Sequence, residues 1–231
     1  MWDAQIAALA SRHRVIAPDL RGFGQSQVSE GRVTMEQFAD DLAGLLDGLG
    51  VSEPVVFCGL SMGGYIAWQF YRKHAGRVRA MILCDTRAVA DTPEARTARF
   101  EMIDRVLREG PEPIAQSMIP KLLAASTIAS HPEKVANVHR MIVANDPRGI
   151  AAAARGIADR PDATTILPQI RCPCLVLVGK FDAISTIEEM RSIAAKIPGA
   201  KLKTIAGAGH LTPVEQPAQT TAAIEAFLAG L

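Results

Sequence analysis

The chain has 231 residues, of which 48% are hydrophobic and 21% charged, a composition typical of a globular enzyme with one sizeable core. Its 25 basic and 24 acidic residues give a net charge of +1, which argues against nucleic acid or an anionic membrane as a partner. No apolar run is long enough to span a bilayer, and residues 1–5 do not resemble a signal peptide. The four cysteines lack the spacing of a zinc or redox site and fit a reducing, cytoplasmic location.

The N-terminal part of the chain predicts two helices with a strand between them. Trp2, Ile6 and Leu9 recur at helical spacing and predict a short amphipathic helix. Residues 14–17 predict a short strand, and residues 34–49 predict a longer helix with an apolar stripe. This longer helix begins with a capping-box pattern, Thr-Met-Glu-Gln, and is followed by a glycine, so the sequence marks both of its ends.

A serine stands at a sharp turn between a predicted strand and a predicted helix. The apolar run 55–58 precedes the pentapeptide Gly-Leu-Ser-Met-Gly at 59–63, and a helical pattern follows to about residue 74. Such a turn lifts the serine hydroxyl above the edge of a sheet, and its glycines let two backbone segments approach closely. The serine also lies at a helix N-terminus, where developing negative charge is stabilised. Ser61 is therefore the candidate nucleophile; the alternative is a buried turn serine in an inactive protein.

A serine hydroxyl needs a base, and the base needs a group that orients it. The predicted strand 174–178 leads into a loop that carries Asp182, and a glycine-rich loop further on carries His210. Asp85, at the end of the predicted strand 78–84, is a rival for the orienting acid because it faces the same end of the sheet. We favour Asp182, since its strand adjoins the unit that contains His210. The alternative for Asp182 is a solvated loop acid.

Residues 87–167 interrupt the alternation of strands and helices. They contain several helix patterns punctuated by prolines and no convincing strand. We expect this region to form a helical cap, inserted into a core of residues 1–86 and 168–231 and covering the active-site end of the sheet. The first helix pattern of the cap places three apolar side chains on one face: Phe100, Ile103 and Leu107.

After the cap the alternation resumes, which predicts a mostly parallel sheet. A helix over 187–197 and a strand over 201–205 follow the strand at 174–178. The last helix is expected to open at Thr212 with a second capping box, Thr-Pro-Val-Glu.

These motifs together resemble the α/β-hydrolase family over essentially the whole chain. They are the serine turn, the segment Ala-Pro-Asp-Leu-Arg-Gly-Phe-Gly-Gln-Ser at 17–26, and Gly-Ala-Gly-His at 207–210 followed by Pro-Val-Glu-Gln-Pro at 213–217. The resemblance implies an α/β-hydrolase fold, a mostly parallel sheet flanked by helices with an inserted helical cap. Within the family, the Ser-Met-Gly-Gly turn and the modest length are similar to small carboxylesterases, enol-lactonases and cofactor-free perhydrolases.

The resemblance also implies a mechanism and a set of site residues. Ser61, His210 and Asp182 would form a Ser-His-Asp triad that transfers an acyl group from a small carboxylic ester or lactone to the serine and then to water. The backbone N–H of Met62 would bind the oxyanion. No metal and no organic cofactor is implied, and the oligomeric state is left open.

The family pattern places further strands and a His-Gly loop ahead of the first helix predicted here, and that loop donates a second oxyanion amide. The sequence begins after this loop, so we expect an N-terminally incomplete fold that lacks one strand between residues 14–17 and 55–58. Losing one oxyanion donor typically costs about 10²–10³ in rate. Weak activity is therefore expected unless another amide replaces the missing donor.

Two other classes of function stay open at this point. The same triad could serve carbon–carbon bond hydrolysis or perhydrolysis. Alternatively, the chain could be an impaired fragment or a non-catalytic binding module. Dehalogenases and epoxide hydrolases of the family are disfavoured, because they use aspartate where this chain has Ser61.

Several other polar residues receive structural interpretations. Asp19 and Arg21 are expected to pair and shape their loop, and Cys58 and Cys84 to be buried in strands. Four histidines without metal-ligand spacing are expected at the surface or in the cap: His13, His74, His131 and His139.

Overall fold

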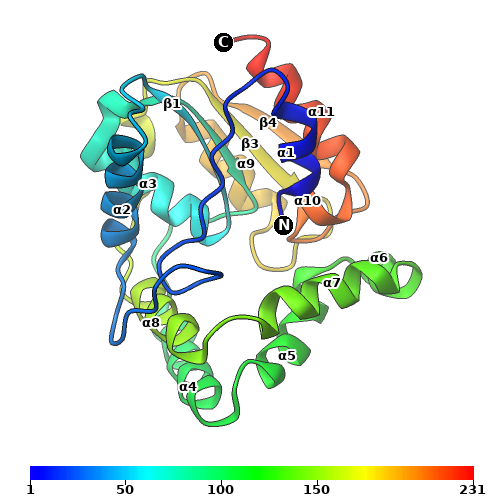
Figure 1. The fold of residues 1–231 in the computed structure, drawn as a ribbon. Coiled ribbons are helices and arrows are strands. Elements are labelled where there is room, and N and C mark those ends of the chain that lie inside the picture. Colours follow the sequence, from blue (N-terminus) through cyan, green and yellow to red (C-terminus); the bar gives the residue numbers. More distant parts are fainter.

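The computed structural model describes all 231 residues and contains one sheet of four parallel strands (Figure 1). In their order across the sheet, the strands are β1 (Val55–Leu60), β2 (Val78–Cys84), β3 (Cys174–Gly179) and β4 (Lys201–Ile205). Gly59 lies opposite Leu83, Leu83 opposite Val176, and Gly179 opposite Ile205. The carboxyl ends of all four strands therefore meet at one edge of the sheet, where the candidate site residues follow them.

Helices cover both faces of the sheet. On one face lie α2 (Met35–Gly48), α3 (Met62–His74) and α9 (Ile187–Lys196). On the other face lie α1 (Asp3–Leu9) and α11 (Pro217–Leu228). Successive residues of β2 point to opposite faces, so Met81 joins a cluster of 27 buried residues and Ile82 a cluster of 16. The sheet is thus the middle layer of three, as the alternating pattern predicts.

Residues 87–167, called the cap below, form helices and no strand. The five cap helices are α4 (Pro93–Glu109), α5 (Glu112–Leu122), α6 (Ala125–Ser130), α7 (Pro132–Val143) and α8 (Pro147–Ala158). Figure 1 shows them in green, gathered at one end of the molecule. Ala152 and Ala153 of α8 belong to the first hydrophobic cluster of the sheet, and Ala115 and Val138 to the second. The cap is therefore packed into both halves of the core.

Helix α2 illustrates why most elements form where the sequence predicts them. The Thr34 side chain accepts from the Gln37 N–H at 3.2 Å, and the Gln37 side chain accepts from the Thr34 N–H at 2.8 Å. Gly50 ends the helix with a φ of 65°. These signals are local, so they do not depend on the rest of the fold. The chain also contains two short 3-10 helices, η1 (Ala75–Arg77) and η2 (Leu167–Gln169). None of the helices combines the length and the apolar character that a membrane span requires.

The predicted strand at residues 14–17 is not formed; the segment runs as a loop in which Val15 is 37% exposed. A strand needs a neighbour for its backbone hydrogen bonds, and β1, the edge strand of the sheet, pairs only with β2. The edge position of β1 also leaves Cys58 exposed, contrary to the prediction, whereas Cys84 in the interior strand β2 is buried.

Two helix details differ from the predictions. The last helix, α11, begins at Pro217 and not at Thr212. Thr212 is the first residue of the short helix α10 (Thr212–Glu215), one position past its N-cap, and its hydroxyl donates to the Asp85 carboxylate at 2.6 Å. In α4, Ile103 and Val106 form the buried face, while Leu107 is 44% exposed. In both places a contact with a distant part of the chain decides the outcome.

Candidate active site

Ser61 lies at the turn between β1 and α3 in a strained conformation. Its φ of 52° is positive, which is rare for a residue with a side chain. Its N–H donates to the carbonyl of Cys84 at 2.9 Å, and its carbonyl accepts from the Thr86 hydroxyl at 2.7 Å. Position 59, two residues before the serine, requires glycine, because a Cβ there would lie 2.4 Å from the carbonyl oxygen of Gly63. The turn is thus held by strand β2 and by its own close packing.

The N-terminus of α3 begins directly after this serine. Met62 is the first residue of the helix, and its N–H has no backbone acceptor. The positive end of the helix dipole adds to the effect of this free N–H. A negatively charged oxygen formed next to Ser61 would find a hydrogen-bond donor there.

Asp182 is held at the turn after β3 by several hydrogen bonds. Its Oδ1 accepts from the N–H groups of Ile184 at 2.8 Å and Ser185 at 3.1 Å. Its Oδ2 accepts from the Ser185 hydroxyl at 2.6 Å and lies 2.9 Å from Nδ1 of His210. Burial alone would raise the pKa of Asp182, but the hydrogen bond and electrostatic interaction with His210, together with the hydrogen bonds from Ser185 and the Ile184 N–H, hold that pKa below its ordinary value.

The contact with Asp182 sets the tautomer of His210. A carboxylate can only accept hydrogen bonds, so Nδ1 of the imidazole carries the proton and Nε2 is left as the basic nitrogen. The residue is 2% exposed, and the backbone N–H of His210 donates to the carbonyl of Leu122 in the cap at 2.9 Å. The structure therefore brings His210 and Asp182 into direct contact.

Asp85, the rival acid, is also fully buried but does not hydrogen-bond to His210. Its Oδ1 accepts from the Gly179 N–H at 2.7 Å, and its Oδ2 accepts from the Thr212 hydroxyl at 2.6 Å. Burial raises the pKa of Asp85 well above its usual range; the hydrogen bonds from Thr212 and Gly179 oppose this effect, and the charge of Asp182 adds to it. The geometry favours Asp182 as the partner of His210.

Ser61 forms no side-chain hydrogen bond with His210 in this structure. Ser61 follows β1 and Asp182 follows β3, so β2 separates them, and the strand ends are about 10 Å apart at ordinary strand spacing. An imidazole ring that contacts Asp182 and points toward β1 can span this distance. The hydrogen bond between a catalytic residue and its base often shortens only when substrate binds.

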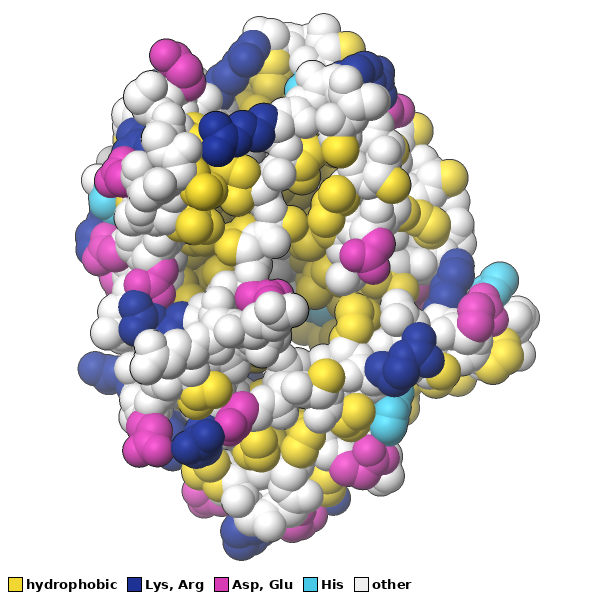
Figure 2. Space-filling model, in the orientation of Figure 1, with side chains coloured by type: hydrophobic (Ala, Val, Ile, Leu, Met, Phe, Trp, Pro, Cys, Tyr) yellow, Lys and Arg dark blue, Asp and Glu magenta, His cyan; other side chains and the backbone are white.

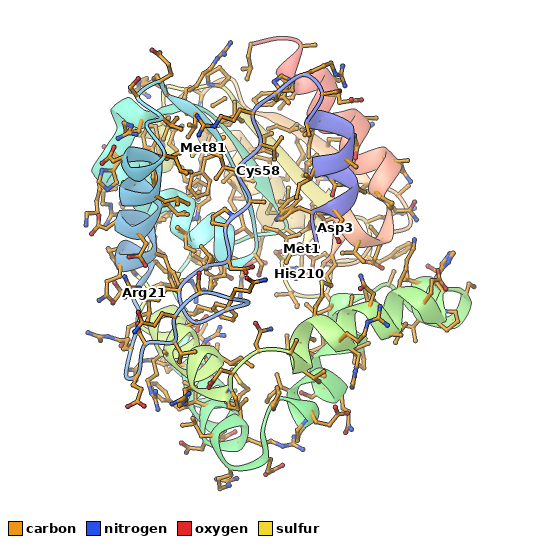
Figure 3. The ribbon with its side chains drawn as sticks, viewed as in Figure 1. Met1, Asp3, Arg21, Cys58, Met81 and His210 are labelled. Carbon is orange, nitrogen blue, oxygen red and sulfur yellow. The ribbon has the colours of Figure 1, made fainter.

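The site opens into a hollow between the sheet and the cap. Figure 2 shows this hollow near the centre of the face, bordered largely by hydrophobic side chains. Figure 3, in the same orientation, labels His210 in the same region, between the sheet and the cap helices. The candidate base therefore lies beside this hollow.

One site residue was not anticipated from the sequence. Ser185 is fully buried, and its hydroxyl lies 2.6 Å from Oδ2 of Asp182 and 3.4 Å from Nδ1 of His210. The signal that could have revealed it is the spacing Asp-x-x-Ser, in which an aspartate accepts from backbone N–H groups two and three residues ahead.

The remaining predicted polar residues lie elsewhere. Asp19 and Arg21 do not pair: Arg21 forms a two-pronged ion pair with Asp41 of α2, while Asp19 accepts from the Gln25 N–H at 2.9 Å. Both oxygens of the Asp41 carboxylate meet the planar guanidinium, a strong bidentate arrangement, while Asp19 is already engaged within its own turn. No three His, Cys, Asp or Glu side chains are grouped as metal ligands would be.

Comparison with known proteins agrees with this architecture. A family model described as the alpha/beta hydrolase fold matches residues 1–217. A thermophilic esterase from Thermogutta terrifontis is 52% identical, with a TM-score of 0.97 over 99% of this chain and 84% of that one. An enol-lactonase from Burkholderia xenovorans is 31% identical, with a TM-score of 0.91 over 99% of this chain and 85% of that one. The 3-oxoadipate enol-lactonase 2 of Acinetobacter baylyi is 29% identical over 99% of this chain and 83% of its own length.

The chain therefore belongs to the α/β-hydrolase family. Within that family it falls in the group of carboxylic ester hydrolases that includes these esterases and enol-lactonases. The predicted fold, a parallel sheet flanked by helices, is confirmed by the structure and by these similarities.

Proposed function

We propose that this protein hydrolyses a small carboxylic ester or lactone through a catalytic triad of Ser61, His210 and Asp182. The observation that carries the proposal is the buried contact of 2.9 Å between Asp182 and Nδ1 of His210, on the sheet edge where Ser61 occupies its strained turn. The similarity to a named esterase and to named enol-lactonases supports the same chemistry.

The first half of the reaction forms an acyl-enzyme. Nε2 of His210 takes the proton of the Ser61 hydroxyl while Oγ attacks the carbonyl carbon of the substrate. The tetrahedral intermediate then collapses, the bond to the leaving oxygen breaks, and the imidazolium returns its proton to that oxygen. Asp182 keeps the imidazole in the required tautomer and stabilises the imidazolium without becoming protonated, in line with its lowered pKa.

The second half releases the acyl group. His210 takes a proton from water, the resulting hydroxide attacks the ester carbonyl on Ser61, and the serine leaves with the proton restored to it. In both halves the free N–H of Met62 donates to the negatively charged oxygen, which is the role proposed for it here. One such donor is worth about 2.7–4 kcal/mol in the transition state.

The substrate class follows from the site surroundings and from the relatives. The hollow beside His210 is bordered mainly by hydrophobic side chains, which suits an uncharged acyl group of modest size. The relatives are named as an esterase and as enol-lactonases, so both an open ester and a cyclic ester are reasonable test substrates.

A fluorophosphonate probe tests the proposal directly. An activated serine displaces fluoride from phosphorus and gains the phosphonyl group, which intact mass spectrometry detects as one adduct. We expect one adduct on the folded wild type and none on Ser61→Ala, together with turnover of p-nitrophenyl acetate by the wild type only. Folded wild-type protein that gains no adduct and shows no turnover would refute the triad.

A further inference from the structure

The side chain of Glu215 joins the loop that carries His210 to the cap. Glu215 ends α10 and is fully buried. One carboxylate oxygen accepts from the N–H of Gly209, the residue before His210, at 2.6 Å. The other accepts from the N–H of Ala124, which lies between α5 and α6 of the cap, at 2.7 Å. A single carboxylate therefore holds two backbone segments that belong to different parts of the fold.

Further hydrogen bonds cross the same boundary. The N–H groups of His210 and Leu211 both donate to the carbonyl of Leu122, at 2.9 and 3.2 Å. Lys134 of α7 donates to the backbone carbonyl of Glu215 at 2.6 Å. The histidine loop, residues 206–211, is thus fixed against the cap by several hydrogen bonds.

Burial of this carboxylate is costly unless its oxygens are hydrogen-bonded. No arginine, lysine or histidine side chain forms an ion pair with it, so the two backbone donors carry its stabilisation. Removing the carboxylate would leave both donors buried without a partner. Asp182 orients the imidazole ring, whereas Glu215 holds the backbone from which that ring projects.

We propose that Glu215 is a positioning residue for the catalytic base: its carboxylate fixes the histidine loop against the cap, so that His210 is correctly placed only when the cap is docked. The inference rests on the proposed function, because it assigns His210 the role of the base. It predicts that the cap contributes to the chemical step as well as to the shape of the substrate space.

The test compares Glu215→Gln with the wild type well below their unfolding temperatures. Glutamine keeps the size of the side chain but offers one accepting oxygen for two donors. We expect kcat to fall by roughly 10- to 100-fold with KM changed less than about threefold, because misplacing a catalytic group by about 1 Å costs about 10²-fold. Hydrogen exchange should accelerate in two segments, residues 120–126 and 205–211.

Thr220→Val is the matched control. Thr220 is fully buried, and its hydroxyl donates to the carbonyl of Thr212 at 2.9 Å, so this variant loses one buried hydrogen bond near α10 without touching the histidine loop. We expect it to lose stability while kcat and exchange at 205–211 stay at the wild-type level. If Glu215→Gln does not fold, Glu215→Asp replaces it, since the shorter side chain keeps the charge but reaches only one donor.

The outcomes separate this proposal from the triad. An active wild type with an equally active Glu215→Gln, or with unchanged exchange in either segment, overturns the positioning role. A wild type that neither turns over ester nor reacts with the fluorophosphonate refutes the proposed function and, with it, a role for Glu215 in catalysis.

Discussion

Two buried aspartates lie at the carboxyl edge of the sheet in environments that shift their pKa values in opposite directions. Asp182 receives hydrogen bonds from two backbone N–H groups, from Ser185 and from His210, and its pKa is lowered. Asp85 is held by only the Thr212 hydroxyl and the Gly179 N–H, and burial raises its pKa. Burial thus raises the pKa of one carboxyl group, while hydrogen bonds and the interaction with His210 lower that of the other.

Substitution by asparagine should separate the roles of these two residues. Asp182→Asn should lower kcat by about 10³- to 10⁴-fold, because the amide no longer stabilises the imidazolium or fixes its tautomer. Asp85→Asn imitates a protonated aspartate and should keep kcat within about threefold of the wild type. Steady-state kinetics on p-nitrophenyl acetate measure both. The reverse pattern would make Asp85 the orienting acid.

The raised pKa of Asp85 also predicts how stability depends on pH. Between the ordinary aspartate pKa of about 4 and the raised pKa in the folded protein, only the folded state holds a proton on Asp85. Stability must therefore fall as the pH rises through this window. The amide introduced by Asp85→Asn cannot titrate, so the free energy of unfolding of the wild type, relative to this variant, should decrease from about pH 4 upward. Urea unfolding of both proteins at several pH values gives this difference; a flat difference would contradict the prediction.

At the level of elements, helix α8 depends on a backbone contact that only glycine permits. A Cβ at Gly156 would lie 1.8 Å from the carbonyl oxygen of Val33, whereas a Cβ at Gly44 in α2 would meet nothing within 4 Å. Next to this contact, the Val33 N–H donates to the carbonyl of Ala152 at 3.1 Å. Helix α8 therefore approaches the segment before α2 at backbone distance.

Alanine at the two glycines should have opposite effects. Gly156→Ala should destabilise the protein by about 1–3 kcal/mol, because α8 must move away from residue 33. Gly44→Ala should stabilise it by up to about 1 kcal/mol, because alanine favours the helix more than glycine does. Urea unfolding of both variants measures the difference. Equal effects would mean that α8 moves aside at no cost.

How far the sequence predicts each element depends on how local its signals are. The strand at 78–84 and the capping box of α2 are encoded within a few residues and form where expected. The segment 14–17 has the composition of a strand but no neighbour to pair with. Thr212 has the pattern of a helix cap, but its hydroxyl is bound by Asp85, 127 positions earlier in the chain. Residue types and order were sufficient to nominate Ser61, Asp182 and His210, but not Ser185 or Glu215.

Across the whole molecule, the larger hydrophobic clusters contain side chains from both the cap and the elements around the sheet. Only a cluster of five buried residues is internal to the cap, and both larger clusters include cap side chains. Most of the buried hydrophobic residues of the cap therefore belong to clusters that the cap shares with the rest of the fold.

A cap with so little core of its own should not unfold separately. We expect urea unfolding followed by tryptophan fluorescence and by far-ultraviolet circular dichroism to give a single, coincident transition. Both tryptophans, Trp2 and Trp68, lie outside the cap, whereas the cap contributes about half of the residues in α-helices. A first transition in circular dichroism alone would show that the cap melts independently.

The attachment of the cap at both of its ends bears on how molecules reach the serine. Gly156 of helix α8 packs against the carbonyl of Val33, and the histidine loop donates two hydrogen bonds to the carbonyl of Leu122, the last residue of α5. A hinged lid would have to break one of these attachments in each turnover. Substrate and product are then expected to pass through the hollow seen in Figure 2 while the cap stays in place. The width of this hollow would then limit the size of the molecules that enter. On this view, esters are selected by whether they are small enough to enter, before they contact any catalytic group.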